Sequence, residues 1–338
     1  MGLDWRNQAV LLTGATGFLG FRTLERLAHE MESGRVIATG RTLRPSHEVV
    51  SSKVSYRLGN LTESAFVAGL FEEHPIRAII HCAGLSSPWG KPEAFYQANV
   101  LSQQHLIKRA KRHGIKRFVF ISSPSVCATH RDRHQVKESD RLPAPINEYA
   151  RTKRLAEELL VKTDLSWITL RPRALVGRGD TVIMPRIVQA VESGRLRILG
   201  SGKNLVDLTP VSNVVDAIVL SLEVSEKSTQ HIYHISNGKP VSMWEAIAYV
   251  LQALGYEAPK RKIPLSLAIG VARVMEGWAK LRGAELEPAL LPYSVSSLGR
   301  SFSLDIRKAQ TLLGYQPQQS IYAAMDEFVE WFKRDLRL

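Results

Sequence analysis

Tyr149 and Lys153 are four positions apart, a spacing that places a phenol and an ammonium group on one face of a helix. A free tyrosine titrates at about pH 10, which is too high for efficient proton transfer at neutral pH. A neighbouring cation favours the phenolate and lowers that pKa. The pair therefore predicts a tyrosine that exchanges a proton with a substrate oxygen, beside a lysine that adjusts its acidity.

Three serines follow the apolar run that ends at Ile121. If that run is a strand of an open parallel sheet, its carboxyl end is the edge where ligands bind. A serine hydroxyl at this edge can hydrogen-bond the same substrate oxygen as Tyr149. We choose Ser123 for this role, with Ser122 and Ser125 as alternatives.

A glycine-rich segment, Thr13 to Gly20, follows a short apolar run and opens a helical pattern. Gly14 permits a tight turn, Gly17 lets a phosphate approach the backbone, and Gly20 lets the helix pack against the strand. The first N–H groups of the helix then face a pyrophosphate. The segment predicts dinucleotide binding, with contacts from Gly14, Thr16, Gly17, Phe18, Leu19 and Gly20.

The end of the second strand decides which dinucleotide is preferred. An Asp or Glu about 20 residues beyond the glycines binds the ribose 2′-hydroxyl of NAD. Here the chain has Arg41 instead, with Arg44 close by and no acid between them. Because a guanidinium suits a 2′-phosphate, we expect NADP(H) to be preferred over NAD(H), with Arg41 as its ligand. The alternative is an ordinary surface arginine in a basic protein.

The elements that must position these residues follow a βαβ pattern, which implies a parallel sheet with right-handed crossovers. We predict strands at 9–12, 35–39, 78–81, 118–121 and 167–170, with 232–235 returning to the sheet. The predicted fold class is α/β: a Rossmann-type doubly wound parallel sheet with a smaller, mainly helical C-terminal substrate domain. We assign 1–177 to the NADP-binding domain, with 205–236 returning to it, and 178–204 and 237–338 mainly to the substrate domain.

Residues 129–147 are polar and carry two prolines, which is typical of a long surface loop. His130 and His134 lie in this loop without neighbouring cysteines or aligned carboxylates. We interpret them as solvated loop residues, and no metal site is predicted.

The chain carries 45 basic and 32 acidic residues, a net charge of +13, which favours anionic partners. The basic residues are scattered and no aromatic interleaving marks a nucleic-acid face, so no nucleic-acid partner is expected. With two cysteines, no apolar signal region and no apolar run long enough to span a membrane, we expect a cytoplasmic protein without a disulfide scaffold.

Residues 260–283 mix apolar residues with six basic ones. A basic amphipathic helix of this kind can make peripheral contact with an anionic membrane. The alternative, which we favour, is a helix buried against the second domain, where it lines the substrate cleft.

The glycine segment TGATGFLG, the serine run and YARTK together resemble the extended short-chain dehydrogenase/reductases. Further stretches resemble the 3β-hydroxysteroid dehydrogenase branch, which includes bacterial 2-alkyl-3-oxoalkanoate reductases. These stretches are Trp89-Gly90, Ala98-Asn99-Val100, LRPRALVG at 170–177, DLTPV at 207–211, ISNG at 235–238 and LGY at 313–315. The resemblance covers nearly the whole chain.

The resemblance implies that Ser123, Tyr149 and Lys153 act as a catalytic triad, that Lys153 also binds the nicotinamide ribose, and that Asn99 supports the site. It further implies cofactor contacts from Asn60, Leu61, Ala83, Gly84 and Pro172. The family has Gly-Asp-Leu where this chain has Gly59-Asn60-Leu61, and the Asn60 amide can still bond adenine. A homodimer paired through the helices carrying Asn99 and Tyr149 is also implied.

The function that we predict is hydride transfer between NADP(H) and a secondary alcohol/ketone pair. The segments expected to wall the cleft are apolar, so we expect a small lipophilic substrate, a 3β-hydroxysteroid or sterol or a 3-oxo/3-hydroxy acyl derivative. One alternative is a nucleotide-sugar epimerase/dehydratase, which would need donors for a diphosphate. The candidate donors are Arg173, Arg178, Arg186, Arg195, Arg197 and Arg300. A non-catalytic NADP sensor is a further alternative, against which the intact Tyr149/Lys153 pair argues.

Overall fold

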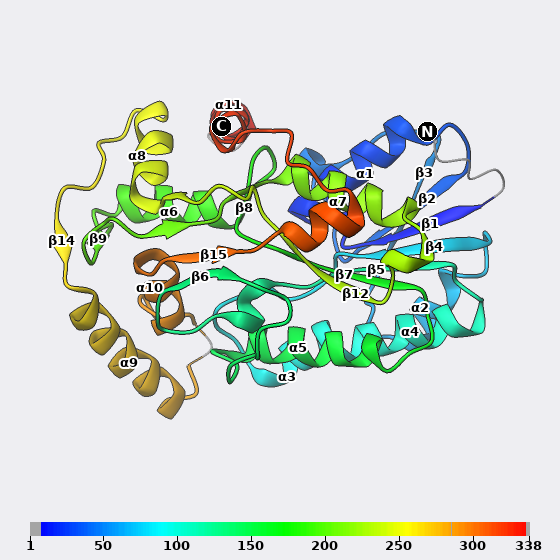
Figure 1. The fold of residues 1–338 in the computed structure, drawn as a ribbon, viewed down its shortest axis with the longest axis horizontal. Helices are drawn as coiled ribbons and strands as arrows, with labels where there is room; N and C mark the ends of the chain where they lie inside the picture. The colour runs from blue at the N-terminus through cyan, green and yellow to red at the C-terminus, as the bar shows by residue number, and fades with distance from the viewer. Residues whose placement is uncertain (1–7, 285, 336–338) are drawn as a thin grey trace.

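The computed structural model describes residues 8–284 and 286–335. Its main sheet has seven strands in the order β12-β7-β5-β4-β1-β2-β3, and every neighbouring pair is parallel (Figure 1). The strands are β1 (Ala9–Thr13), β2 (Arg35–Gly40), β3 (Val54–Leu58), β4 (Ile76–His81), β5 (Arg117–Ile121), β7 (Trp167–Pro172) and β12 (His231–Ile235). The predicted doubly wound α/β fold is confirmed. The strand order reverses between β1 and β4, which is where such sheets bind dinucleotides.

Helices cover both faces of this sheet, so its central strands are buried throughout. One face carries α1 (Phe18–Glu30) and α7 (Val211–Glu223), which pack against each other (Figure 1). The other face carries α2 (Ser64–Gly69), α4 (Ser102–Arg112) and α5 (Glu148–Val161). Neighbouring residues of β1 separate accordingly: Leu12 joins the core under α1, and Leu11 joins the core under α4 and α5.

The helical stretch from Pro92 to Arg112 changes its geometry in the middle. A short helix α3 (Pro92–Tyr96) continues through a π-helical segment, Gln97–Leu101, into α4. The π-helical segment contains Asn99, which is 2% exposed. Such segments are often found at functional sites.

A buried ion pair fastens α5 to the sheet. Arg171 of β7 donates to both carboxylate oxygens of Glu157 of α5, at 2.8 and 2.6 Å. Their side chains are 2% and 4% exposed. Burial works to lower the pKa of Arg171, but the Glu157 carboxylate outweighs it and the net pKa is raised. The Arg171 guanidinium therefore remains charged inside the core, and its two hydrogen bonds to Glu157 hold α5 at a fixed height against β7.

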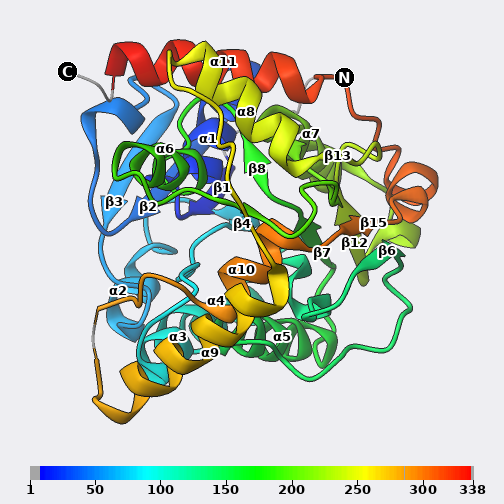
Figure 2. The same ribbon diagram turned by 90° about the vertical axis from the view of Figure 1, so that its left-hand side faces the viewer.

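The C-terminal part forms a second layer with its own core beside the carboxyl edge of the main sheet (Figures 1 and 2). Its helices are α6 (Ile183–Glu192), α8 (Met243–Ala253), α9 (Leu265–Leu281), α10 (Pro292–Gly299) and α11 (Ile321–Asp335). A small sheet joins β13 (Val241–Ser242), β10 (Leu205–Val206), β15 (Phe302–Leu304) and β6 (Arg133–Val136). Two short pairs complete the layer: β8 (Leu175–Val176) with β11 (Thr209–Pro210), and β9 (Ile198–Leu199) with β14 (Lys262–Ile263).

The predicted division into domains stays a prediction, but the path of residues 205–236 is clear. β10 pairs with β13 and β15 in the small sheet. α7 then packs against α1, and β12 pairs with β7 in the main sheet.

The prediction of a surface loop over residues 129–147 is wrong at its centre. Arg133–Val136 forms β6, which pairs in parallel with β15. In the part of the chain that the structure describes, no three His, Cys, Asp or Glu side chains are grouped so that they could hold a metal ion. His130 is instead 2.7 Å from the Ser296 hydroxyl.

α9 lies within the predicted helical segment 260–283 but does not have the predicted burial. Ala268, Ile269 and Ala272 are its buried residues. A second apolar face is exposed on its outer side, formed by Leu267, Val271, Val274, Trp278 and Leu281. The favoured interpretation of a buried helix therefore holds for one face only. No helix in the described part of the chain is long and apolar enough to cross a membrane.

Candidate active site

The loop between β1 and α1 requires glycine at two positions for reasons internal to the protein. Gly14 has a φ of +69°, and a Cβ atom there would lie 2.6 Å from the backbone nitrogen of Ala83. A Cβ atom on Gly20 would lie 2.0 Å from the carbonyl oxygen of Gly14. At Gly17 the same atom would meet nothing closer than 3.4 Å, which is ordinary contact. The fold does not require glycine at position 17, so its bare backbone is available to a ligand.

This loop fits the pyrophosphate of a dinucleotide. α1 begins at Phe18, and its N-cap residue Gly17 has no side chain with which to cap it. The first N–H groups of the helix lack intrahelical partners, and the helix dipole makes this end partly positive. Phe18, Leu19 and Gly20 therefore offer donors to phosphate oxygens, as predicted for an anion site at a helix N-terminus.

Two arginines, Arg41 and Arg44, are exposed just beyond the end of β2. His47 lies behind them and fixes this segment to the phosphate loop. Its ring stacks on Phe21 with a centroid distance of 4.8 Å, and its Nδ1 is 3.0 Å from the carbonyl oxygen of Thr16. The guanidinium groups of Arg41 and Arg44 have no ion pair with any described residue.

The predicted adenine contacts follow β3. Asn60 is exposed, and its Oδ1 accepts a hydrogen bond from the N–H of Thr62 at 3.1 Å. Its amide nitrogen has no hydrogen-bond partner among the described residues. Leu61 packs against the core on the α4 side, and its carbonyl is 3.1 Å from Nδ1 of His105. The adenine roles of Asn60 and Leu61 stay predictions.

Asn99 holds the loop that follows β4. Its Oδ1 accepts from the N–H of Leu85 at 2.7 Å, and its Nδ2 donates to the carbonyl of Leu85 at 3.1 Å and to the hydroxyl of Thr152 at 3.0 Å. A Cβ atom on Gly84 would lie 2.8 Å from Oδ1 of Asn99 and 3.1 Å from Nζ of Lys153. Asn99 is therefore a positioning residue, which keeps the backbone of this loop close against the lysine.

Lys153 is 4% exposed beneath that loop. Its Nζ donates to the carbonyl of Ile121 at 2.8 Å and is 4.9 Å from the centroid of the Phe120 ring. Burial lowers the pKa of Lys153 to about 8, although Cys82 and Glu157 act to raise it. The charge of the lysine therefore changes close to physiological pH.

Tyr149, at the start of α5, is near enough to the Ser123 side chain for it to affect the phenol. Burial raises the pKa of Tyr149 to about 12, while Ser123 acts to lower it and Tyr293 acts to raise it. The sequence predicted a lowered pKa, from the cation four residues away. Lys153 is not among the groups that shift this pKa and burial dominates it, so Tyr149 is a protonated phenol at neutral pH.

The structure separates the three serines. The Ser122 hydroxyl donates to Oε1 of Glu157 at 2.5 Å, which commits it to the buried ion pair. The Ser125 hydroxyl is buried and has no hydrogen-bond partner among the described residues. Ser123 is the one that reaches Tyr149, and its Oγ also accepts from the N–H of Ser125 at 3.2 Å. The choice of Ser123 agrees with this geometry, and its catalytic role stays a prediction.

Pro172 is the buried last residue of β7, opposite Ile235 of β12. The residue after it, Arg173, leaves the carboxyl edge of the sheet toward the second layer. Its guanidinium lies over the Phe302 ring, 4.8 Å from the centroid.

Tyr293 of α10 was not predicted as a site residue. It acts electrostatically on both Tyr149 and Arg173, so it is within electrostatic range of both. The sequence offers no signal for it, because nothing in the local pattern indicates that α10 turns a phenol toward the end of β5.

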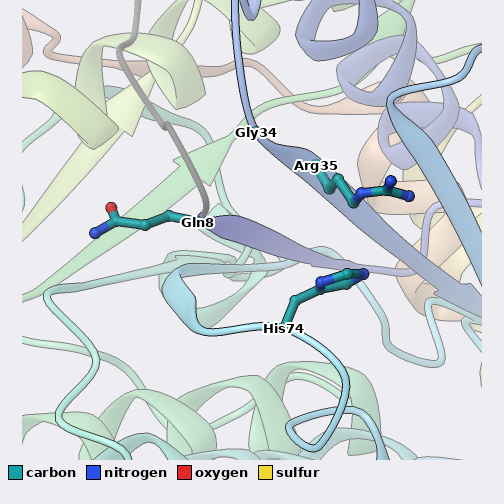
Figure 3. A pocket seen from close by; sticks show the side chains of 4 residues that line it. All are labelled: Gln8, Gly34, Arg35 and His74. Carbon is teal, nitrogen blue, oxygen red and sulfur yellow. The ribbon is translucent and has the colours of Figure 1, made fainter.

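The hollows elsewhere on the protein are not this site. One of about 350 Å³ is lined by Gln8, Gly34, Arg35 and His74 (Figure 3). Gln8, Gly34 and His74 come just before β1, β2 and β4, and Arg35 is the first residue of β2, so the hollow lies at the amino edge of the sheet, opposite the phosphate loop. A second, of about 700 Å³, lies beside β12 and includes Trp167, His231 and Lys308. Neither contains a residue of the predicted site.

Comparison with known proteins agrees with this arrangement. Residues 10–236 match the family described as the NAD dependent epimerase/dehydratase family. The chain is 31% identical over 324 residues to a 2-alkyl-3-oxoalkanoate reductase of Stenotrophomonas maltophilia, covering 92% of this chain and 96% of the relative. It is 30% identical to 3beta-hydroxysteroid-dehydrogenase/decarboxylase isoform 1 of Arabidopsis thaliana, covering 94% and 79%.

A solved structure with the same fold is a UDP-glucuronic acid 4-epimerase from Bacillus cereus in complex with NAD, with a TM-score of 0.74, 19% identity, and coverage of 96% and 99% of the two chains. At that identity the likeness concerns the fold alone. The family match and the relatives at about 30% identity go further: the chain belongs to the NAD dependent epimerase/dehydratase family and is an NAD-dependent oxidoreductase of the extended short-chain dehydrogenase/reductase type.

Proposed function

We propose that the protein is an NADP(H)-dependent oxidoreductase that interconverts a secondary alcohol and a ketone on a lipophilic substrate of the 3-hydroxy/3-oxo acyl or sterol type. The observation that carries the proposal is that Tyr149, whose pKa Ser123 affects, and Lys153, which bonds the last carbonyl of β5, both come from α5 to the sheet edge that also carries the phosphate loop. The relatives named for 3-oxoalkanoates and 3β-hydroxysteroids support the substrate class.

In this proposal each side chain has one task. The bound nicotinamide supplies or accepts the hydride. In the reductive direction Tyr149, protonated at neutral pH, gives its proton to the substrate oxygen. Ser123 donates a hydrogen bond to that oxygen and holds it in line with Tyr149. Asn99 and Lys153 fix the floor of the site.

The arginines argue for a lipid rather than a nucleotide sugar. Five of the six candidates for binding a diphosphate are engaged elsewhere. Arg178 pairs with Glu25, Arg186 with Glu287, and Arg300 with Asp132; Arg195 bonds the Ser193 hydroxyl, and Arg197 bonds two backbone carbonyls. Arg173 alone remains, and one guanidinium is a poor match for two phosphates.

The test is NADPH consumption with a panel of methyl 3-oxodecanoate, a 3-ketosteroid, UDP-glucose and UDP-glucuronic acid. We expect turnover of a lipid ketone, and a loss of at least about 100-fold in Tyr149→Phe, the usual scale for a general acid. Tyr322→Phe is the matched control, because Tyr322 is 43% exposed on α11, which packs against α8 rather than α5. Turnover of the UDP-sugars without turnover of either lipid would replace this proposal by the epimerase/dehydratase alternative.

The preference for NADP over NAD is part of the proposal and rests on Arg41. Arg41→Ala should weaken NADPH binding about tenfold or more, since a charged hydrogen bond is lost, and leave NADH binding nearly unchanged. Arg44→Ala is the parallel variant. If it weakens NADPH binding and Arg41→Ala does not, Arg44 is the residue that binds the 2′-phosphate. Equal losses for NADPH and NADH would remove both residues from 2′-phosphate recognition.

A further inference from the structure

The backbone on both sides of Arg173 is locked, so its side chain has a defined starting point. Its N–H donates to the carbonyl of Ile235 at 3.0 Å, and its carbonyl accepts from the hydroxyl of Thr209. The guanidinium then lies over Phe302, which is itself 7% exposed. Aromatic stacking of this kind pre-organises a guanidinium for an anion.

The Arg173 side chain lacks the partners that a partly buried arginine normally has. Its Nε is buried without a hydrogen bond, and no described carboxylate lies within 4 Å of the guanidinium. Asp207 acts on it only from a longer range, and one Asp207 oxygen is engaged by the N–H of Leu304 at 2.7 Å. Removing a charge from water without pairing it is costly, which indicates that a partner is missing from the protein itself.

Tyr293 connects this cation to the site of chemistry. Its phenol acts on both Arg173 and Tyr149, and no described residue hydrogen-bonds its hydroxyl. Because Leu170 of β7 is paired with Ile121 of β5, Arg173 leaves the end of β7 close to Ser123 at the end of β5. A ligand whose oxygen lies at Tyr149 therefore places its nearest substituents beside Tyr293 and Arg173.

We propose that Arg173, with Tyr293, forms a subsite for an oxyanion of the substrate, and that this anion is a carboxylate carried close to the reacting carbon. The proposal rests on the proposed function and narrows its substrate to a 3-hydroxy/3-oxo acid rather than a neutral lipid. A carboxylate matches one planar guanidinium in charge and shape. A diphosphate would also pair with the guanidinium, but it carries more negative charge than one arginine can neutralise.

The experiment compares freshly prepared 3-oxodecanoate with its methyl ester, followed by NADPH oxidation. The measured quantity is the acid-to-ester ratio of kcat/KM. We expect this ratio to fall about 10- to 100-fold in Arg173→Met, which is the scale of a lost charged hydrogen bond. Arg173→Lys should retain part of it. Arg195→Met is the matched control, because Arg195 is an exposed arginine bonded to Ser193, and it should keep the full ratio.

A binding measurement keeps this inference separate from the proposed function. Decanoate and decanol are titrated into the NADP-bound protein, and only the affinity for decanoate should depend on Arg173. If no ketone is reduced but decanoate binding still needs Arg173, the proposed function fails and the subsite stands. Equal losses for acid and ester, or for decanoate and decanol, would make Arg173 a structural residue. Binding of UDP-glucose that disappears in Arg173→Met would assign the subsite to a diphosphate and overturn the carboxylate.

A second, independent observation is the exposed apolar face of α9. Leu267, Val274, Trp278 and Leu281 are 58%, 73%, 60% and 85% exposed, and their spacing puts them on one side of the helix. Monomeric proteins rarely expose a contiguous apolar face of this kind without a partner for it. α9 lies at the outer edge of the molecule, next to α10, which carries Tyr293 (Figures 1 and 2).

The charge around this face selects its partner. Residues 260–283 contain six basic side chains, Lys260, Arg261, Lys262, Arg273, Lys280 and Arg282, and one acidic side chain, Glu276. Glu276 is paired with Lys280 at 3.1 Å, and Arg282 lies 3.7 Å from the centroid of the Trp278 ring. From apolar side chains flanked by cations we infer that α9 docks on an anionic lipid surface, where a lipophilic substrate would be met.

The test is co-sedimentation with vesicles of phosphatidylcholine alone and of phosphatidylcholine with 30% phosphatidylglycerol. We expect binding to the anionic vesicles, weakened by salt through screening and lost in Trp278→Glu with an unchanged unfolding temperature. Val50→Glu is the control, since Val50 is 92% exposed on another surface. Equal binding of Trp278→Glu and the parent protein would overturn the inference. So would a concentration-dependent dimer that Trp278→Glu dissociates, because the face would then bind a second copy of this chain.

Discussion

The two ionisable side chains at the centre of the site are shifted in opposite directions by the same cause. Burial disfavours a charged form, so it raises the pKa of Tyr149 to about 12 and lowers that of Lys153 to about 8. At pH 7 Tyr149 is therefore a neutral phenol, and Lys153 is mainly a charged ammonium group. This is the protonation state that a ketone reductase needs.

The pH dependence of the reduction should follow Lys153 rather than Tyr149. As pH rises through about 8 the lysine loses its proton, while Tyr149 keeps its own until about 12. We expect kcat/KM for reduction to fall along a basic limb near pH 8. The variant Lys153→Arg should turn over more slowly, but its side chain stays charged. Its basic limb should therefore move above pH 10, because a guanidinium does not deprotonate in this range. A limb that stays near pH 8 in Lys153→Arg would show that another group titrates there.

At the scale of single residues, the sequence predicted those whose neighbours are set by local spacing. Tyr149 and Lys153 are one helical turn apart, and Ser123 follows a strand, so their proximity to the sheet edge could be expected. Arg173 and Tyr293 are 120 positions apart in the chain. Their proximity depends on how α10 packs over the end of β7, which no local pattern encodes.

Substitutions in the phosphate loop can distinguish a glycine needed for cofactor binding from one needed for folding. Gly17→Ala places a methyl group where the fold has room, so the free energy of unfolding should fall by only about 1 kcal/mol, the scale of a poorer helix cap. Dinucleotide affinity should nevertheless fall at least tenfold, because the methyl group keeps the pyrophosphate from the backbone. Chemical denaturation and cofactor titration measure the two effects.

Gly20→Ala is the matched variant, with the opposite balance. Its Cβ would lie 2.0 Å from the Gly14 carbonyl oxygen, so the unfolding midpoint should drop by an amount that reflects several kcal/mol. Unchanged cofactor affinity in Gly17→Ala would mean that the pyrophosphate binds elsewhere.

Elements with strong periodicity were predicted within a few residues, and those that depend on distant partners were not. α9 (Leu265–Leu281) lies within the predicted segment 260–283, because its apolar pattern is sustained over 17 residues. β6 was missed because Arg-His-Gln-Val has no strand pattern, and its pairing is supplied by β15, far along the chain. The exposed face of α9 was mistaken for a buried one, since hydrophobicity alone does not distinguish a core from a docking surface.

For the whole molecule, the Glu157–Arg171 pair joins α5, which carries Tyr149 and Lys153, to the main sheet. Glu157→Gln would leave a buried cation without its counter-charge, so stability should fall by about 3–5 kcal/mol. The double variant Glu157→Leu/Arg171→Met should recover most of that loss, because it removes both charges together. Urea denaturation of the single and double variants checks this. A loss of less than about 1 kcal/mol in Glu157→Gln would show that the pair is not needed to hold α5.

The π-helical segment that contains Asn99 also affects the geometry of the helices around it. Such a segment holds one more residue than an α-helix of equal length, so everything beyond Leu101 is rotated relative to α3 by about 100°, the angle of one helical residue. The side of α4 that meets α5, and the direction in which Asn99 points, are thus set by the phase of a single inserted residue. Loss of one residue here would return the segment to a regular α-helix and leave the rest of α4 facing as it does now, but Asn99 would change direction and Leu85 would lose its clamp. This part of the site is therefore more sensitive to the length of the segment than to the identity of most residues in it.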